Sequence, residues 1–259
     1  MSRNLEILQR VEGATARAPE PEAASEQVLG TRLVLANPPA IPRDGRRTAL
    51  DVDKLLREEL CKVAQRLFLL PGSFKAVVFS GVGEENGCGR VCAQIGEILD
   101  SQAPRSVCLV DANFPAPYLH EYFDISNDGG LTDAVLHPGP VTDFARRVRG
   151  ANLWVVPAGT IGSEWPNLVN SGRMRLRIHE LCELYDHVLI NAPACGVFAD
   201  AMHLGKLVDG IVVVLRANAT RREAARKVKQ DMEAANVRLL GAVLNDRTFP
   251  IPDAIYSRL

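Results

Sequence analysis

The chain has 259 residues, of which 47% are hydrophobic and 24% charged, and its formal net charge is −1. This length suffices for one α/β domain of about 200 residues with an appendage, and the near-neutral charge gives no electrostatic footprint for nucleic acid. No apolar run approaches the roughly 18 residues of a membrane-spanning helix, and the N-terminus lacks the apolar core of a signal peptide. The six cysteines are scattered without paired CxxC spacing, which indicates a reduced, cytoplasmic protein.

The first part of the chain differs in composition from the rest. A short helical pattern runs from Leu5 to Val11, and the stretch from Ala14 to Arg47 is rich in Ala, Pro, Glu and Arg. Such a composition is typical of a flexible linker. We therefore expect a short helix and a disordered extension over residues 1–50, followed by a folded domain over residues 51–259.

From Asp51 onward the pattern is typical of alternating helices and strands. Apolar residues first recur at helical spacing between Leu55 and Phe68. Short apolar runs then alternate with amphipathic stretches: Ala76–Ser80, Val107–Asp111, Leu153–Pro157, His187–Asn191, Ile211–Arg216 and Leu240–Asn245. These runs are too uniformly apolar for strands with one solvated face, so the sequence predicts an α/β fold with a doubly wound, mostly parallel sheet. Ligands of such sheets bind at the carboxyl ends of the strands.

The first of these strand ends lies in the stretch FSGVGEENGCGRVCAQIGEIL, residues 79–99. A strand that ends near Ser80, a loop with several glycines and a helix that begins near Val91 form the layout of a phosphate-binding loop. In such a loop, backbone N–H groups and the helix N-terminus surround the phosphates, a lysine bridges the outer ones and a Ser or Thr hydroxyl holds magnesium. The chain has neither a Gly-Lys-Ser nor a Gly-Lys-Thr string, so the layout is present without these two side chains.

Several longer stretches together resemble a known family. DANFPAPYLHEYFDISNDGGLTDAVL, LWVVPAG, LVNSGRMRLRIHELCELYDHVLINAP and VDGIVVVLRANATRREA are similar, in order and approximate spacing, to the bacterial tyrosine kinases of capsule and exopolysaccharide synthesis, within the MinD/ParA class of P-loop ATPases. The resemblance covers roughly residues 51–246. It implies a P-loop NTPase fold, ATP and magnesium as cofactors, and tyrosine phosphorylation. It also implies a homo-oligomer, and the cytoplasmic part of a membrane chain-length or export protein as a partner.

The resemblance assigns the residues of the loop. The matching positions are Gly87 and Gly89 for the loop glycines, Cys88 between them, Arg90 for the lysine, Val91 for the magnesium hydroxyl and Cys92 for the next hydroxyl. Arginine keeps the charge, but its planar fork cannot act as a compact point charge between phosphates, and valine offers magnesium no ligand. We therefore expect either weak nucleotide binding or a structural turn that binds no phosphate.

The polar positions at the other strand ends are only partly retained. Asp111 corresponds to an acidic residue that helps to hold magnesium and serves as a base, or else it is a capping residue. Asn191 stands at the position of the Walker B aspartate, where an amide lacks the charge that holds the water shell of magnesium. Asp200 matches a family aspartate near the site, or caps the next helix. Asn245 matches the residue that contacts adenine, or lies in a surface turn.

Two other features of the family are also altered. Glu59, Lys62 and Gln65 occupy the positions of a Glu-x-x-Arg-x-x-Arg self-assembly motif, and only Tyr256 remains of the C-terminal tyrosine cluster as a candidate phospho-acceptor. A ring of molecules that phosphorylate their neighbours is therefore not expected.

Lysine, hydroxyl and Walker B carboxylate are all replaced at one magnesium–phosphate site. Because phosphoryl transfer depends on positioning and charge stabilisation, the sequence predicts an impaired kinase-like protein. The resemblance, and not the replaced residues, implies its expected role, which is to regulate polymer synthesis through a partner at the cytoplasmic side of the inner membrane. Two alternatives stay open: an active kinase or ATPase that uses Arg90 and Asp111 in unusual roles, and a MinD/ParA-like positioning protein.

The replaced side chains also suggest a repair. If the loop keeps the shape of a phosphate cradle, the combined changes Arg90→Lys, Val91→Ser and Asn191→Asp are expected to restore magnesium-dependent ATP binding. The segment Gly83–Asn86 is about two residues longer than the family's loop. If any part of the chain blocks the phosphate position, we expect it to be this segment.

Overall fold

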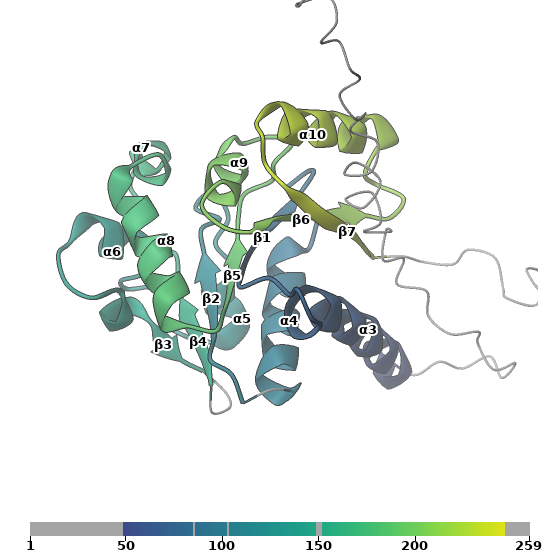
Figure 1. Ribbon diagram of the computed structural model, residues 1–259, viewed down its shortest axis with the longest axis horizontal. Coiled ribbons are helices and arrows are strands. Elements are labelled where there is room, and N and C mark those ends of the chain that lie inside the picture. The colour runs from purple at the N-terminus through teal and green to yellow at the C-terminus, as the bar shows by residue number, and fades with distance from the viewer. Residues whose placement is uncertain (1–48, 85, 103, 149–151, 247–259) are drawn as a thin grey trace, which may run out of the picture. The chain divides into compact units, whose positions relative to one another are not determined.

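The computed structural model describes residues 49–84, 86–102, 104–148 and 152–246. Within these ranges, the strands form one seven-stranded sheet in the order β3-β4-β2-β5-β1-β6-β7 (Figure 1). The strands are β1 (Ala76–Gly81), β2 (Val107–Asp111), β3 (Arg146–Arg147), β4 (Leu153–Val156), β5 (His187–Asn191), β6 (Gly210–Arg216) and β7 (Leu239–Asn245). Neighbouring strands are parallel except β3, which runs antiparallel to β4. The predicted doubly wound, mostly parallel sheet is confirmed.

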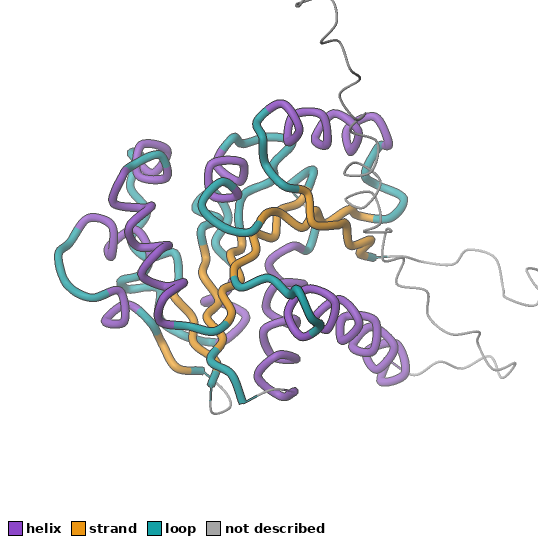
Figure 2. Tube along the Cα trace, in the orientation of Figure 1, coloured by secondary structure: helices purple, strands orange, loops and turns teal. Residues whose placement is uncertain are grey.

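Helices cover both faces of this sheet (Figure 2). One face packs against α3 (Ala49–Ala64), the π-helical turn η1 (Gln65–Leu69), α4 (Cys88–Gln102) and α5 (Leu119–Phe123). The other packs against α6 (Leu131–Leu136), the 3-10 turn η2 (Val141–Phe144), α7 (Trp165–Val169), α8 (Gly172–Leu184), α9 (Asp200–Gly205) and α10 (Arg222–Ala234).

Strand β1 shows why the predicted runs are apolar at every position. Val77 and Phe79 belong to the core under α3 and α4, whereas Ala76 and Val78 belong to the core on the opposite face. Successive side chains of a strand point to opposite faces, so a strand covered on both faces needs apolar residues throughout. Strand β3 was not predicted, because two arginines at the edge of a sheet carry no apolar pattern.

Helix α3 begins at Ala49, close to the predicted start of the domain. Residues 1–48 and 247–259 lie outside the described residues, and with them the expected helix at Leu5–Val11, the linker and Tyr256. At the predicted self-assembly positions, Lys62 forms an ion pair with the buried Glu59 at 2.5 Å, and Gln65 opens the π-helical turn. None of the helices in the described ranges is long and apolar enough to cross a membrane.

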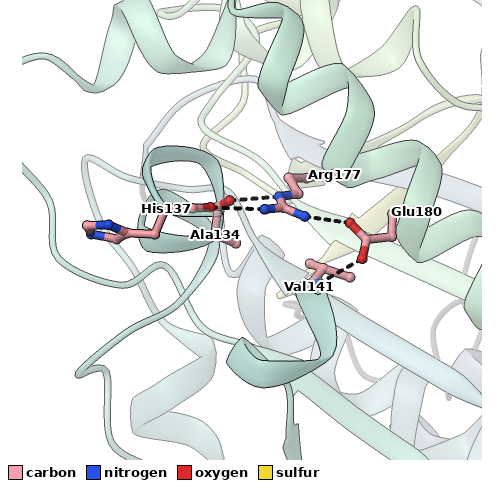
Figure 3. Close-up of polar contacts among 5 residues, drawn as sticks. All are labelled: Ala134, His137, Val141, Arg177 and Glu180. Carbon is pink, nitrogen blue, oxygen red and sulfur yellow. Dashed lines mark hydrogen bonds and ion pairs between the residues drawn. The ribbon is translucent and has the colours of Figure 1, made fainter. Parts of the chain in front are cut away.

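Arg177 and Glu180 of α8 fix the segment that joins α6 to η2 (Figure 3). Arg177 donates to the carbonyl oxygens of Ala134 and His137 at 2.7 and 3.0 Å, where α6 ends. Its guanidinium also lies 2.7 Å from Glu180, which accepts the N–H of Val141 at 2.8 Å. One ion pair therefore supplies hydrogen-bond partners for backbone carbonyls at the end of α6 and for a backbone N–H at the start of η2.

His187 is a buried histidine at the start of β5. It is 3% exposed, and neither ring nitrogen has a hydrogen-bond partner of normal geometry among the described residues. The ring of Phe68 meets it edge-on, with centroids 5.3 Å apart. Burial lowers the pKa of His187, and the nearby Arg105 lowers it further. The folded chain therefore resists protonation of this ring.

Replacing His187 by leucine is expected to flatten the dependence of stability on pH. Because the folded-state pKa lies below the unfolded value of about 6.5, the unfolded chain binds more protons, and the parent loses stability as pH falls through that value. At pH 8 the variant is expected to be up to about 1 kcal/mol more stable, with a larger advantage at pH 5.5. Urea denaturation at both pH values measures this. His179→Leu, at an exposed position of α8, is the control, and equal pH slopes in all three proteins would contradict the expectation.

Candidate functional site

The predicted site residues come together at the carboxyl edge of the sheet. Strand β5 lies between β2 and β1, and Asp111 at the end of β2 is in register with Asn191 at the end of β5. The loop that follows β1 connects to α4, and Asn245 at the end of β7 reaches the same loop. This is the edge at which a doubly wound sheet binds its ligands.

The helix after the loop begins earlier than predicted. Helix α4 starts at Cys88 rather than near Val91, because the side chain of Asn86 caps it: Oδ1 of Asn86 accepts the N–H of Cys88 at 2.7 Å. Gly87, between them, has φ +70°, a conformation that favours glycine. The sequence Asn-Gly-Cys was therefore the signal for this earlier helix start.

Asn86 also fills the inside of the loop. Its Nδ2 donates to the carbonyl oxygens of Gly83 and Glu84, the second at 3.2 Å. The residue is 6% exposed, and its carboxamide lies so close to Gly81 that a Cβ atom there would overlap it. Asn86 thus places its own side chain in the space that a phosphate cradle leaves for its ligand.

The three replaced loop positions point in different directions. Arg90 is exposed and makes no hydrogen bond or ion pair within the described ranges, whereas Val91 and Cys92 are buried in the core beneath α4. The charge of Arg90 is felt by Tyr122, whose pKa is raised to about 12 by burial and by Glu97, with Arg90 opposing the rise. The cation at the position matched to the lysine is therefore exposed to solvent, whereas the carboxamide of Asn86 is buried inside the loop.

Asp111 is fully engaged with backbone groups and with Asn191. One carboxylate oxygen accepts the N–H groups of Tyr118 and Leu119 at 2.7 and 2.8 Å. The other accepts from the N–H of Asn113 at 3.2 Å and from Nδ2 of Asn191 at 2.9 Å. Burial raises the pKa of this fully buried carboxyl, and the four hydrogen bonds oppose that rise. Asp111 thereby caps the start of α5 and ties β2 to β5.

Asn191 supplies the neutral partner that Asp111 needs. Its side chain is fully buried, and its Nδ2 points to Asp111. The Oδ1 atom of Asn191 has no hydrogen-bond partner in the part of the chain that the structure describes. An aspartate here would bring a second negative charge against Asp111, so the amide at the Walker B position matches its surroundings.

The remaining candidates make local contacts. Asn245 donates from Nδ2 to the main-chain oxygen of Asn86 at 3.1 Å. Asp200 is the first residue of α9 and is 7% exposed; burial raises its pKa, and no hydrogen bond joins it to the other candidates within the described ranges. The sequence did not single out Tyr118, whose ring packs so closely on Gly89 that a side chain there would collide with it.

These residues do not fit a magnesium ion. Val91 has no ligand atom, and both oxygens of Asp111 already accept two hydrogen bonds each. No group of three or more His, Cys, Asp or Glu side chains in the described residues is arranged to hold a metal. Mg²⁺ requires near-octahedral oxygen ligation, often with carboxylates, so a direct bond from Asp111 to the ion would require hydrogen bonds of this carboxylate to break.

The comparisons with known proteins agree with this fold. No protein-family model matches the chain. The tyrosine-protein kinase YwqD of Bacillus subtilis is 28% identical over 173 residues, which cover 67% of this chain and 73% of that protein. The chain is a homologue of bacterial tyrosine-protein kinases. The tyrosine-protein kinase wzc of Salmonella typhi is 25% identical over 169 residues, which cover 65% of this chain but only 23% of that protein.

Solved structures of bacterial kinase domains and of MinD have a fold similar to that of this chain. The kinase domain of VpsO has a TM-score of 0.70 at 20% identity, and the match covers 78% of this chain and 100% of that one. The septum site-determining protein MinD of Pyrococcus horikoshii, solved with Mg-ADP, has a TM-score of 0.56 at 19% identity, over 71% of this chain and 76% of that one. The predicted P-loop NTPase fold and the resemblance to bacterial tyrosine kinases are confirmed, and the likeness to MinD concerns the fold alone.

Proposed function

We propose that the chain is a catalytically impaired, kinase-like regulator of capsule or exopolysaccharide synthesis. The observation that carries the proposal is that the polar groups of the site, apart from Oδ1 of Asn191, are engaged by the protein itself. Asn86 fills the loop, Asp111 binds three backbone N–H groups and an amide, and Asn245 binds the loop. Among the candidate site residues in the described ranges, the one cation is Arg90, whose side chain is exposed to solvent.

The chemistry of phosphoryl transfer supports this proposal. That reaction relies on positioned cations and a metal rather than on covalent catalysis. Removing one stabilising group from a preorganised site costs about 100-fold or more in rate, and here the lysine, the metal-binding hydroxyl and the Walker B carboxylate are all replaced. The alternative of an active kinase would need Arg90 to turn into the loop and Asp111 to leave its partners.

The proposed partner and location follow from the relatives. In wzc of Salmonella typhi most of the protein lies outside the match, which is consistent with a kinase-like domain that works together with further segments. For this chain we propose a separate partner, the cytoplasmic part of a membrane chain-length or export protein, and a location at the cytoplasmic side of the inner membrane. A homo-oligomer belongs to the same proposal.

Two measurements test the function. Purified protein incubated with Mg-ATP is expected to form no phosphotyrosine detectable by mass spectrometry. In the native host, deletion of the gene is expected to change the length of the polymer, and the Arg90→Ala variant is expected to restore it as well as the parent does. Phosphotyrosine that disappears in Arg90→Ala but persists in Arg175→Ala, which alters an exposed arginine of α8, would establish the active kinase instead. Unchanged polymer after deletion would refute the regulatory role.

A further inference from the structure

The loop between β1 and α4 has an interior that suits an amide better than a phosphate. A phosphate offers only acceptor oxygens, so a loop that binds it must present donors. Here the N–H of Cys88 points inward, but so do the carbonyl oxygens of Gly83 and Glu84, because all three bond to the same carboxamide. One donor and two acceptors match the Oδ1 and Nδ2 atoms of asparagine, whereas a phosphate fits only once the two carbonyls are released from the carboxamide and turn outward.

We propose that Asn86 is a built-in substitute for phosphate, which holds the loop in a filled conformation without any nucleotide. Its Oδ1 accepts a hydrogen bond at the N-terminus of α4, where a phosphate oxygen would accept one. The idea rests on the proposed function, because it gives a physical reason why an impaired relative keeps the shape of the loop. It goes further in naming the residue that excludes the nucleotide and stabilises the site in its place.

Residues at the ends of three elements surround Asn86. Gly81 at the end of β1 leaves the space that the carboxamide occupies, since a Cβ atom there would overlap it. The start of α4 donates through Cys88. The end of β7 donates from Asn245 to the main-chain oxygen of Asn86 at 3.1 Å. Asn86 therefore links β1, α4 and β7, and its side chain is buried although Gly83, Glu84 and Gly87 are exposed.

The test is chemical rescue of an emptied loop by an inorganic anion. Asn86→Ala in the full chain removes the carboxamide and is expected to lower Tm by roughly 5 °C, since a helix cap and two further hydrogen bonds are lost. Millimolar sodium pyrophosphate is expected to recover at least about half of that loss, because the N–H of Cys88 and the helix end then lack an acceptor. The parent protein is expected to show no shift beyond that caused by sodium chloride at equal ionic strength.

Asn127→Ala is the matched control. Asn127 also bridges a loop through both atoms of its carboxamide: Oδ1 accepts the N–H of Gly159 at 2.9 Å and Nδ2 donates to its carbonyl oxygen at 3.2 Å. It is expected to lose stability without rescue by pyrophosphate. Equal shifts in Asn86→Ala, Asn127→Ala and the parent, or no shift in any of them, would overturn the proposal.

A second variant distinguishes two roles of Asn86: filling the loop with an amide, and only capping helix α4. Asn86→Asp keeps the acceptor for Cys88, and aspartate caps helices as well as asparagine does, but it turns a carboxylate oxygen toward the carbonyls of Gly83 and Glu84. We expect a lower Tm than the parent at pH 7 that rises toward the parent as pH falls and the carboxyl becomes protonated. An Asp variant at least as stable as the parent at pH 7 would show that Asn86 is only a cap. That result would not contradict the proposed function, because this stability measurement tests neither ATP turnover nor polymer length.

Discussion

Asp111→Ala is expected to destabilise the chain by about 3–5 kcal/mol, a large part of the stability of an ordinary domain. The substitution removes the acceptor of three backbone N–H groups and of the Asn191 amide, all at a fully buried position. The donors at the start of α5 then have no partner, and water cannot reach them without local unfolding. Urea denaturation followed by circular dichroism measures the change.

A stability loss in Asp111→Ala would indicate a structural carboxylate, whereas an unchanged or higher stability would indicate a catalytic one. A carboxylate kept ready for a metal or a proton is held at a cost, so its removal leaves stability unchanged or raises it. Asp231→Ala, at an exposed position of α10, is the control and is expected to change stability by less than about 0.5 kcal/mol. An Asp111→Ala variant as stable as the parent would mean that the network around Asp111 contributes little to the fold.

Asn191→Asp is expected to be nearly as damaging, although it restores the residue that the family resemblance implies at this position. The change replaces the donor at 2.9 Å from Asp111 by a second carboxylate in a buried site. Two such groups cannot both be ionised without a large cost, and we expect a loss of about 3 kcal/mol at pH 7. Because a raised pKa favours the protonated form, the loss is expected to shrink as pH falls toward 5.

The exchanged pair provides the matched control. Asp111→Asn combined with Asn191→Asp keeps one carboxylate and one amide at the two positions, and it is expected to recover part of the stability lost by Asn191→Asp. Full recovery is not expected, because an asparagine at 111 has only one oxygen for three backbone N–H groups. If Asn191→Asp were stable at pH 7 and gained stability on addition of magnesium, the two side chains would form a metal site after all.

The three-residue repair suggested by the sequence now has a different expected outcome. Arg90→Lys, Val91→Ser and Asn191→Asp together leave Asn86 inside the loop and add the charge conflict at Asp111. We therefore expect no magnesium-dependent ATP binding from this triple variant. The sequence had identified the segment Gly83–Asn86 as the obstacle, but the contacts of the Asn86 carboxamide became visible only in three dimensions.

The sheet was predictable because a strand that is buried on both faces needs apolar residues at every position, and this requirement is visible in the sequence as a uniformly apolar run. Val107–Asp111 and His187–Asn191 match β2 and β5 to the residue. Strand β3 was missed because edge pairing of two arginines leaves no such pattern. The start of α4 was misplaced by three residues because apolar periodicity reports where a helix packs rather than where it is capped.

The chemistry of the site was less predictable than its location. The position of Asp111 at a strand end follows from topology, but its partners are backbone N–H groups that any sequence would supply, so no residue pattern reveals them. The match between Asn191 and Asp111 joins residues 80 positions apart. Only the fold shows that the amide at 191 and the carboxylate at 111 form one pair.

Calorimetric titration of the purified chain with ATP, with and without magnesium, tests most directly whether the protein itself occupies its own site. Since Asn86 fills the loop and Asp111 has no free oxygen lone pair, we expect no saturable heat at millimolar ATP and no effect of magnesium. Binding at micromolar ATP that is lost when magnesium is chelated would contradict this, because such binding requires a loop that opens and a carboxylate that leaves α5.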